Sequence, residues 1–213
     1  METRPGTAYP LGATFDGTGT NFAIYSSVAT AVTLCLLDDD LNEMRIPMTE
    51  VDAYVWHVYV PQVRAGQRYG YRIDGPWDPM NGLRCDPSKL LLDPYAKAIE
   101  GQLKDSLSLL SYRSDDPLVL KGGDSAAATM HSIVVNPFFD WQGDHSPGHD
   151  YSESIIYEAH IKGMTMRHPD VPEELRGTYA GMAHPAIIEH LTKLGVTTVE
   201  LMPIHQFTND TTL

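Results

Sequence analysis

Hydrophobic side chains in the first hundred residues recur with the two-residue period that is typical of half-buried strands. The pattern predicts strands over residues 20–25, 31–37, 51–60 and 69–73. The third run would place four large side chains on one face, namely Tyr54, Trp56, Val58 and Val60. Turn-forming residues separate the runs, for example at 16–19 and 74–76. Short strands at this spacing predict a small antiparallel β-sandwich over residues 1–100.

Residues 101–152 lack this periodicity. The stretch 121–129 is rich in Gly, Ala and Ser, and only 133–135 is typical of a short strand. We therefore expect an extended connector with little hydrophobic core of its own.

From residue 154 the pattern changes to that of a parallel β-α-β unit. Residues 154–162 and 196–202 are apolar strand candidates. A helix is predicted over 185–194, because Pro185 suits the first helical position and Gly195 suits the C-terminal cap. Its apolar stripe consists of Ile187, Ile188, Leu191 and Leu194. Strand, helix and strand in this order imply two parallel neighbours with a right-handed crossover.

Length limits what this β-α-β unit can form. A (β/α)₈ barrel needs about 250 residues, whereas about 60 residues follow position 153. One such unit cannot cover both faces of a parallel sheet. We therefore expect residues 153–213 to be the opening of a larger domain that is truncated.

Charge and composition exclude several classes of protein. With 15 Lys and Arg against 28 Asp and Glu, the formal net charge is −13, which excludes nucleic acid and anionic membranes as preferred partners. Hydrophobic residues make up 42% of the chain, as in globular rather than disordered proteins. No apolar run approaches the roughly 18–20 residues of a membrane helix. The first residues also lack the apolar core of a signal peptide, so we expect a cytoplasmic location.

The cysteines and histidines indicate neither a metal nor a cofactor. Cys35 and Cys85 are fifty positions apart and outside any CxxC pair, so no thiolate zinc site or redox motif is predicted. Cys35 lies in an apolar run and is expected in the core. The densest histidine cluster contains His145 and His149, but a Pro-Gly pair between them excludes a helix that would place both on one face.

Several longer motifs resemble one enzyme family. In the first part of the chain they are YPLGATFDG at 9–17, GTNFA at 19–23, GQRYGYR at 66–72, GPWDP at 75–79 and KLLLDPYA at 89–96. In the last part they are IYEAH at 156–160, ELRGTYAG at 174–181 and GVTTVELMP at 195–203. The ordered set resembles the start of bacterial glycogen debranching enzymes of the isoamylase type.

This resemblance implies a fold and an activity. Residues 1–100 would form an immunoglobulin-like β-sandwich, a family 48 carbohydrate-binding module, and 101–152 would connect it to the next domain. Residues 153–213 would be the first βαβ unit of a truncated (β/α)₈ barrel of the α-amylase superfamily, glycoside hydrolase family 13. The expected fold class is therefore mainly β. The family hydrolyses α-1,6 branch linkages in glycogen by a retaining double displacement.

The resemblance implies no catalytic residue on this chain. Retaining hydrolysis needs two carboxyl groups about 5–5.5 Å apart, one as nucleophile and one as acid/base. The family carries them on later barrel strands, in an Arg-x-Asp motif and a Glu motif, so we expect this chain alone to be inactive. Glu158 and His160 share one face of the predicted strand and could form an acid/base pair. A supporting polar layer is the simpler interpretation.

Five residues are candidates for contact with carbohydrate. In the β domain they are the aromatic residues Trp77, Tyr71 and Trp56, which offer flat apolar faces. Trp56 lies mid-strand among valines, where core packing is the simpler interpretation. Lys162 and His205 lie near the carboxyl ends of the two predicted parallel strands, where barrels place their chemistry.

Two other functions stay open besides that of an enzyme's N-terminal part. The chain could be a stand-alone α-glucan-binding module, or a docking partner of a full-length homologue. Glycogen or another α-glucan is the expected ligand. An incomplete barrel should also expose apolar side chains, and this predicts self-association. The side chains concerned are Ile187, Ile188, Leu191 and Val199.

Overall fold

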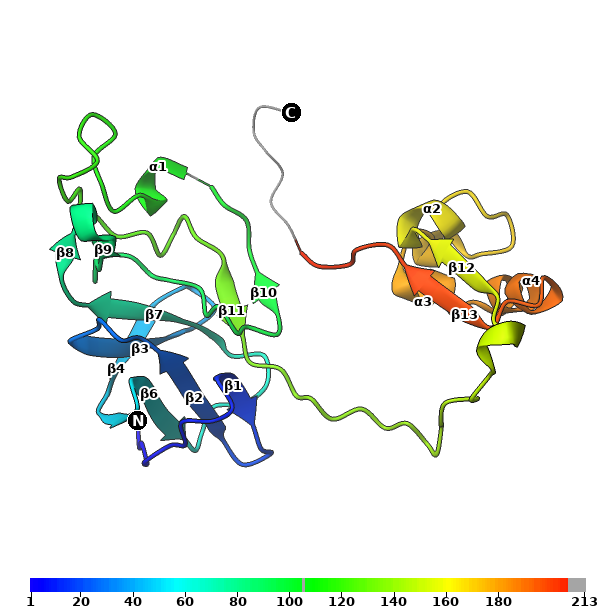
Figure 1. The fold of residues 1–213 in the computed structure, drawn as a ribbon, viewed down its shortest axis with the longest axis horizontal. Coiled ribbons are helices and arrows are strands. Elements are labelled where there is room, and N and C mark those ends of the chain that lie inside the picture. The colour runs from blue at the N-terminus through cyan, green and yellow to red at the C-terminus, as the bar shows by residue number, and fades with distance from the viewer. Residues whose placement is uncertain (105, 207–213) are drawn as a thin grey trace. The chain divides into compact units, whose positions relative to one another are not determined.

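The computed structural model describes residues 1–104 and 106–206, and the chain divides into two compact units (Figure 1). Unit 1 is Met1–Phe139, and unit 2 is Asp140–Leu213. Unit 1 consists mainly of strands, whereas unit 2 combines two strands with short helices. In the described ranges, no helix is long and apolar enough to cross a membrane.

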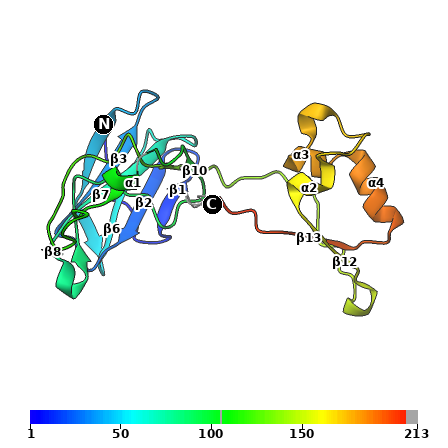
Figure 2. The same cartoon turned by 90° about the horizontal axis from the view of Figure 1, so that it is seen from above.

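Unit 1 contains two antiparallel sheets, seen from a second side in Figure 2. The first has the order β1-β2-β6-β5, with β1 at Gly12–Phe15, β2 at Thr20–Tyr25, β6 at Val55–Val60 and β5 at Glu50–Asp52. The second has the order β10-β11-β7-β3-β4, with β10 at Ile99–Glu100, β11 at His131–Ile133, β7 at Arg68–Asp74, β3 at Ala31–Leu37 and β4 at Glu43–Met48. The smaller elements are β8 at Trp77–Asp78, a 3₁₀ turn at Pro79–Asn81, β9 at Leu83–Arg84 and α1 at Ser106–Leu109. The mainly β fold is thus confirmed, with β2, β3 and β7 close to their predicted positions.

Side chains from both sheets meet in one core, which makes unit 1 a sandwich. Phe22 of β2 and Tyr69 of β7 have no exposed surface, and their rings meet edge to face with centroids 5.0 Å apart. Tyr71 extends this contact, with its ring centroid 5.9 Å from that of Tyr69. The predicted inward face of β6 is confirmed for Val58 and Val60, which lie in the same core. The period-two rule explains the arrangement, since alternate residues of a strand point to one face.

A hairpin replaces the single strand predicted over 51–60. β5 ends at Asp52 and β6 begins at Val55, with Ala53 and Tyr54 between them at φ values of 49° and 68°. Two successive positive φ values are typical of a type I′ turn, which prefers Asn and Gly. Ala and Tyr carry no such signal, so the sequence pattern missed the turn. Tyr54 consequently leaves the strand face on which it was expected.

The segment from 101 to 139 also differs from the extended connector that we expected. It belongs to unit 1, adds β11 to the second sheet and buries Val134 in the main core. A buried cation, the ammonium group of Lys89, anchors it. The acceptors of this ammonium are the carbonyl oxygens of Ser108, Gly122 and Gly123, at 2.8–3.0 Å. Composition does not predict such bonds, because every residue type offers a carbonyl oxygen.

A second buried cation joins β7 to β4 and to two loops. Arg72 of β7 is 3% exposed, and its guanidinium donates to both carboxylate oxygens of Glu43 in β4. It also donates to the carboxylate of Asp124 at 2.8 Å. The carbonyl oxygens of Pro87 and Ser88 accept two further hydrogen bonds. A guanidinium is buried at low cost only when its donors are satisfied in this way.

Unit 2 contains two parallel strands, β12 at Ile156–Ala159 and β13 at Thr198–Leu201. Between them in the chain lie α2 at Ile161–Thr165, α3 at Tyr179–Met182 and α4 at Pro185–Lys193. Short 3₁₀ turns occur at Tyr151–Glu153 and Glu173–Leu175. The strand–helix–strand order and the helix that begins at Pro185 are confirmed. The described residues form no closed barrel.

β12 ends earlier than the sequence predicted, because His160 caps the next helix. Its Nδ1 accepts a hydrogen bond from the backbone N–H of Gly163 at 3.0 Å. The strand therefore stops at Ala159, and Lys162 lies on α2. The expectation that Glu158 and His160 share one strand face is wrong for the same reason.

The apolar stripe of α4 is only partly exposed. Ile187 is fully buried within unit 2, which corrects the expectation that it would face solvent. Ile188 is 53% exposed and Val199 of β13 is 39% exposed, as expected for a sheet with few neighbours. Unit 2 thus buries part of its apolar surface by itself.

The Arg72 network yields a stability prediction. Arg72→Met should destabilise the chain by about 3 kcal/mol, because it removes the buried partner of the Glu43 carboxylate and leaves only the exposed Arg45 beside it. Urea denaturation of both proteins at neutral pH measures this difference. Arg113→Met is the matched control, because the Arg113–Asp115 ion pair is exposed and should contribute less than about 1 kcal/mol. Equal effects of the two substitutions would contradict the prediction.

The same network predicts the direction of acid sensitivity. Burial raises the pKa of Glu43, but hydrogen bonds from Arg72 and Arg45 outweigh it, so the pKa lies below its usual 4.5. A depressed carboxyl pKa stabilises the fold fully above pH 4.5, and this contribution is lost as the pH falls through the folded-state pKa. The acid-induced loss of stability should therefore be smaller in Arg72→Met.

Candidate functional site

Two of the three aromatic candidates are engaged in packing. Tyr71 has no exposed surface, so its ring cannot stack on a sugar in this structure. Trp56 of β6 is half-buried and packs against the main core. The structure therefore places Tyr71 in the sandwich interior, whereas Trp56 packs against the same core and keeps part of its surface exposed.

Trp77 lies at the start of the β8–β9 hairpin and is half-buried. Its indole N–H donates to the carbonyl oxygen of Leu118 at 2.8 Å. Its register partner Arg84 lies over the ring of Tyr112, 5.3 Å from the centroid. Trp77 thus fixes the segment that follows α1, and part of the residue stays exposed.

Tyr25 and Tyr54 form an exposed aromatic pair that the sequence did not predict. Tyr25 is 52% exposed and Tyr54 is 61% exposed, and their rings meet edge to face with centroids 6.4 Å apart. Tyr25 ends β2, and the backbone N–H of Ser26 donates to the carbonyl oxygen of Tyr54 at 2.9 Å. The pair is therefore held by the end of a strand and a tight turn. No sequence signal identifies it, because the Ala-Tyr turn was not recognisable.

Tyr54 has an uncommon backbone conformation for an aromatic residue. A bulky side chain at positive φ costs free energy, and such strain concentrates at binding and catalytic sites. Here the strained turn presents the ring to solvent beside Tyr25. Two adjoining, exposed aromatic faces provide the apolar surface on which the C–H face of a sugar ring packs.

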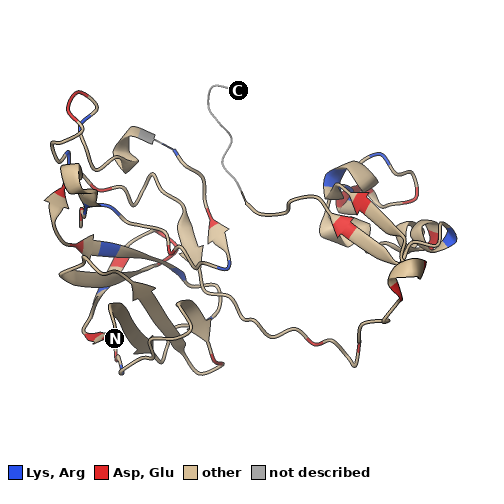
Figure 3. Cartoon of the chain, viewed as in Figure 1, with Lys and Arg blue, Asp and Glu red and all other residues tan. Residues whose placement is uncertain are grey.

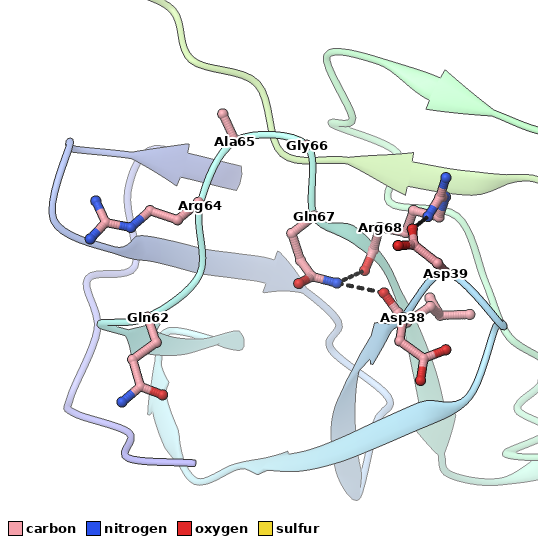
Figure 4. Close-up of a pocket in the computed structure, with 9 residues that line it drawn as sticks. Asp38, Asp39, Gln62, Arg64, Ala65, Gly66, Gln67 and Arg68 are labelled. Carbon is pink, nitrogen blue, oxygen red and sulfur yellow. Dashed lines mark hydrogen bonds and ion pairs between the residues drawn. The ribbon is translucent and has the colours of Figure 1, made fainter.

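A polar hollow of about 360 Å³ opens at another place in unit 1 (Figure 4). It is lined by residues 37–39, 62 and 64–68, with no aromatic side chain among them. Its polar groups are largely engaged with one another. The Gln67 amide donates to the carbonyl oxygens of Leu37 and Arg68. The Arg68 guanidinium is shared between Asp39 and Glu100. A ligand here would have to displace these bonds, so the hollow is the weaker candidate.

In unit 2 a smaller hollow of about 180 Å³ contains Lys162. It lies where β12 and β13 end, and Tyr179 and Met202 also line it. His205 is exposed but does not line this hollow. The structure therefore associates Lys162 with a cavity and leaves His205 apart from it.

The in-register pair Glu158 and Glu200 is the one place in unit 2's described sheet where two carboxylates adjoin. Both side chains are exposed. Neighbouring in-register carboxylates repel each other, so this arrangement does not stabilise the isolated sheet. No sequence pattern had indicated this pair.

Charged and nucleophilic groups give no further site. Lysines and arginines are scattered over both units rather than gathered on one element (Figure 3). Within residues 1–104 and 106–206, no three His, Cys, Asp or Glu side chains come together as metal ligands. Burial raises the pKa of Cys35 to about 12, and Cys35 is packed in a small core cluster as predicted. Such a thiol is protonated at neutral pH and is no nucleophile.

The chain is similar to a known family of carbohydrate-binding modules and to longer proteins of glycogen metabolism. The model of the family "Carbohydrate-binding module 48 (Isoamylase N-terminal domain)" matches residues 10–96. A "Glycogen operon protein GlgX homolog" of Mycobacterium tuberculosis is 57% identical over 98% of this chain, which corresponds to 29% of that protein. A "Glycogen debranching enzyme" of Yersinia enterocolitica is 48% identical over 93% of this chain and 30% of its own length. The chain thus spans less than a third of these relatives.

Solved structures share the fold at low sequence identity. Apo pullulanase from Paenibacillus barengoltzii aligns with 95% of this chain and 28% of its own, with a TM-score of 0.64 and 22% identity. Pullulanase from Anoxybacillus sp. LM18-11, complexed with maltotetraose, aligns with 93% of this chain and 26% of its own, with a TM-score of 0.59 and 23% identity.

Proposed function

We propose that this chain, whose residues 10–96 match the model of the family 48 carbohydrate-binding modules, is the N-terminal part of a glycogen debranching enzyme. The complete enzyme would hydrolyse α-1,6 branch linkages in glycogen. Identity of 57% over 98% of the chain to a GlgX homologue is the main support. In this proposal β12, β13 and the helices between them are the first βαβ unit of a (β/α)₈ barrel. The cytoplasmic location and self-association stay predictions.

Within this protein, unit 1 would bind the α-glucan. The main support for glucan binding by unit 1 is the exposed pair Tyr25 and Tyr54. Their rings offer a fixed apolar surface, and a rigid platform loses little conformational entropy on binding. Trp77, which is only half-buried, is a second contact in this proposal.

Native electrophoresis in gels containing glycogen tests the binding site. The 213-residue chain should be retarded by glycogen, and the double variant Tyr25→Ala/Tyr54→Ala should bind about tenfold more weakly because stacking is lost. Trp77→Ala should weaken binding less.

Two controls separate stacking from folding. Tyr151→Ala removes another exposed aromatic side chain, 99% exposed in unit 2, and should leave retardation unchanged. Tyr71→Phe removes a buried hydroxyl that has no hydrogen-bond partner, so it should also bind normally. Retardation that is unchanged in the double variant would refute this site, and so would equal weakening by Tyr151→Ala.

A second prediction concerns catalysis. The isolated chain should release no reducing ends from glycogen, because no catalytic carboxyl pair of the family can be assigned on it. A reducing-sugar assay with long incubation measures this directly. Any reproducible release would contradict the prediction. If that release disappeared in both Glu158→Gln and Glu200→Gln, the in-register carboxylates of β12 and β13 would be the catalytic pair.

A further inference from the structure

The turn between β8 and β9 contains Asn81 followed by Gly82, which is the one Asn-Gly pair in the sequence. Both residues are exposed, and they lie between the paired strands that carry Trp77 and Arg84 (Figure 1). A side-chain amide followed by glycine can react with its own backbone, because glycine has no side chain that shields its backbone nitrogen. The turn is therefore a candidate site of spontaneous deamidation.

Deamidation at this pair would proceed through a cyclic imide. The backbone nitrogen of Gly82 attacks Cγ of Asn81, so that an N–C bond forms and the Cγ–Nδ2 bond breaks. The proton of the Gly82 amide leaves together with the side-chain NH₂ group as ammonia. Solvent water then opens the imide at either of its two carbonyl groups and yields aspartate or isoaspartate. Because the turn is exposed, solvent supplies this water and no cofactor is needed.

The surroundings of Gly82 leave space around the attacking nitrogen. The φ of Gly82 is +79°, in the left-handed region that favours glycine. A Cβ at this position would meet no other segment within 4 Å. No packed element therefore covers this side of the turn, and the reaction is not blocked by a neighbouring side chain.

Two hydrogen bonds restrain the reacting groups in the folded chain. The side-chain Nδ2 of Asn81 donates to the carboxylate of Asp78 at 2.7 Å, and the backbone N–H of Gly82 donates to the carbonyl oxygen of Pro79 at 3.2 Å. The first bond fixes the side chain of Asn81, and donation to an anion polarises the amide so that Cγ becomes a weaker electrophile. The second bond keeps the proton on the nitrogen that must attack. Folding therefore slows the reaction at an otherwise open site.

Asn42 provides a comparison within the same chain. Its side-chain amide is exposed and donates to the carboxylate of Asp38 at 2.9 Å, as that of Asn81 donates to Asp78. The next residue is Glu43 rather than glycine, and its side chain is bound by Arg72. The two asparagines therefore share the same kind of carboxylate partner and differ in the residue whose nitrogen attacks.

We infer that Asn81 is a site of spontaneous deamidation, and that Asp78 is the positioning residue that slows this reaction in the folded chain. The product replaces a hydrogen-bond donor by a second carboxylate beside Asp78, so the bond is lost and two like charges adjoin. The turn between β8 and β9 then loosens. Because β8 carries Trp77, whose indole bonds the carbonyl oxygen of Leu118, the reaction weakens the anchor of the segment after α1. The inference does not rest on the proposed function.

Peptide mass spectrometry and an isoaspartyl methyltransferase assay measure the product after the 213-residue chain has been incubated in mildly alkaline buffer. Aspartate and isoaspartate should accumulate at Asn81 severalfold faster than at Asn42. Asp78→Ala should raise the rate at Asn81 severalfold, because the side chain loses its hydrogen-bond acceptor. Asp140→Ala removes another exposed carboxylate of a turn and should leave the rate unchanged.

Denaturation separates the effect of the folded turn from that of the local sequence. In urea the wild-type chain and Asp78→Ala should react at the same rate, because the hydrogen bond no longer exists. An effect of Asp78→Ala that persists in urea, or no effect on the folded chain, would overturn the role of Asp78. Equal product at Asn42 and Asn81, or no product at Asn81, would overturn the site itself.

Asn81→Asp reproduces one product of the reaction and tests its consequence. Amide hydrogen exchange at residues 82–84 should be severalfold faster in this variant than in the wild-type chain, because two carboxylates adjoin in the turn. Asn81→Ala removes the donor without adding a charge and should have a smaller effect. Asn42→Asp should leave exchange at these amides unchanged. Unchanged exchange in Asn81→Asp would overturn the loosening of the turn.

Discussion

The ring contact between Phe22 and Tyr69 joins the two sheets of unit 1, and it decides which aromatic side chains can meet a ligand. With centroids 5.0 Å apart and no exposed surface, the two rings lie at the centre of the sandwich. The Tyr69 hydroxyl donates to the buried carboxylate of Asp93 at 2.7 Å, so its polar end is satisfied inside the core. Tyr71 packs on the same ring. Because strand alternation directs these side chains inward, aromatic residues at strand ends and turns are the ones left for binding.

Two buried cations extend this core to segments that have little hydrophobic surface. Lys89 binds three carbonyl oxygens, one in α1 and two in the segment after it, and Arg72 binds Glu43, Asp124 and two more carbonyl oxygens. Both residues are at most 3% exposed. Trp77 bonds the same segment at Leu118. The surroundings of Trp77 thus depend on electrostatic anchoring as much as on hydrophobic packing.

Hydrophobic periodicity predicted the strands and the helix that have one buried face and one exposed face. β2, β3, β7 and α4 follow their predicted ranges closely, since burial of one face determines the pattern. The resemblance to glycogen debranching enzymes depended on ordered motifs. It is confirmed by the names of the relatives that the chain matches. Features that depend on single backbone conformations or on carbonyl acceptors were not predictable: the Ala53–Tyr54 turn, the cap at His160, and the anchoring of 101–139 by Lys89. The Tyr25–Tyr54 pair was missing from the predicted carbohydrate contacts for this reason, because the exposure of Tyr54 arises from the turn.

A crystal structure of the chain grown with a maltooligosaccharide would test the central claim, that the exposed tyrosine pair rather than the buried aromatic residues meets the glucan. The account predicts a glucose ring packed on the faces of Tyr25 and Tyr54, with the ring contact of Phe22, Tyr69 and Tyr71 unchanged. Sugar bound elsewhere on unit 1, with Tyr25 and Tyr54 uncovered, would contradict it.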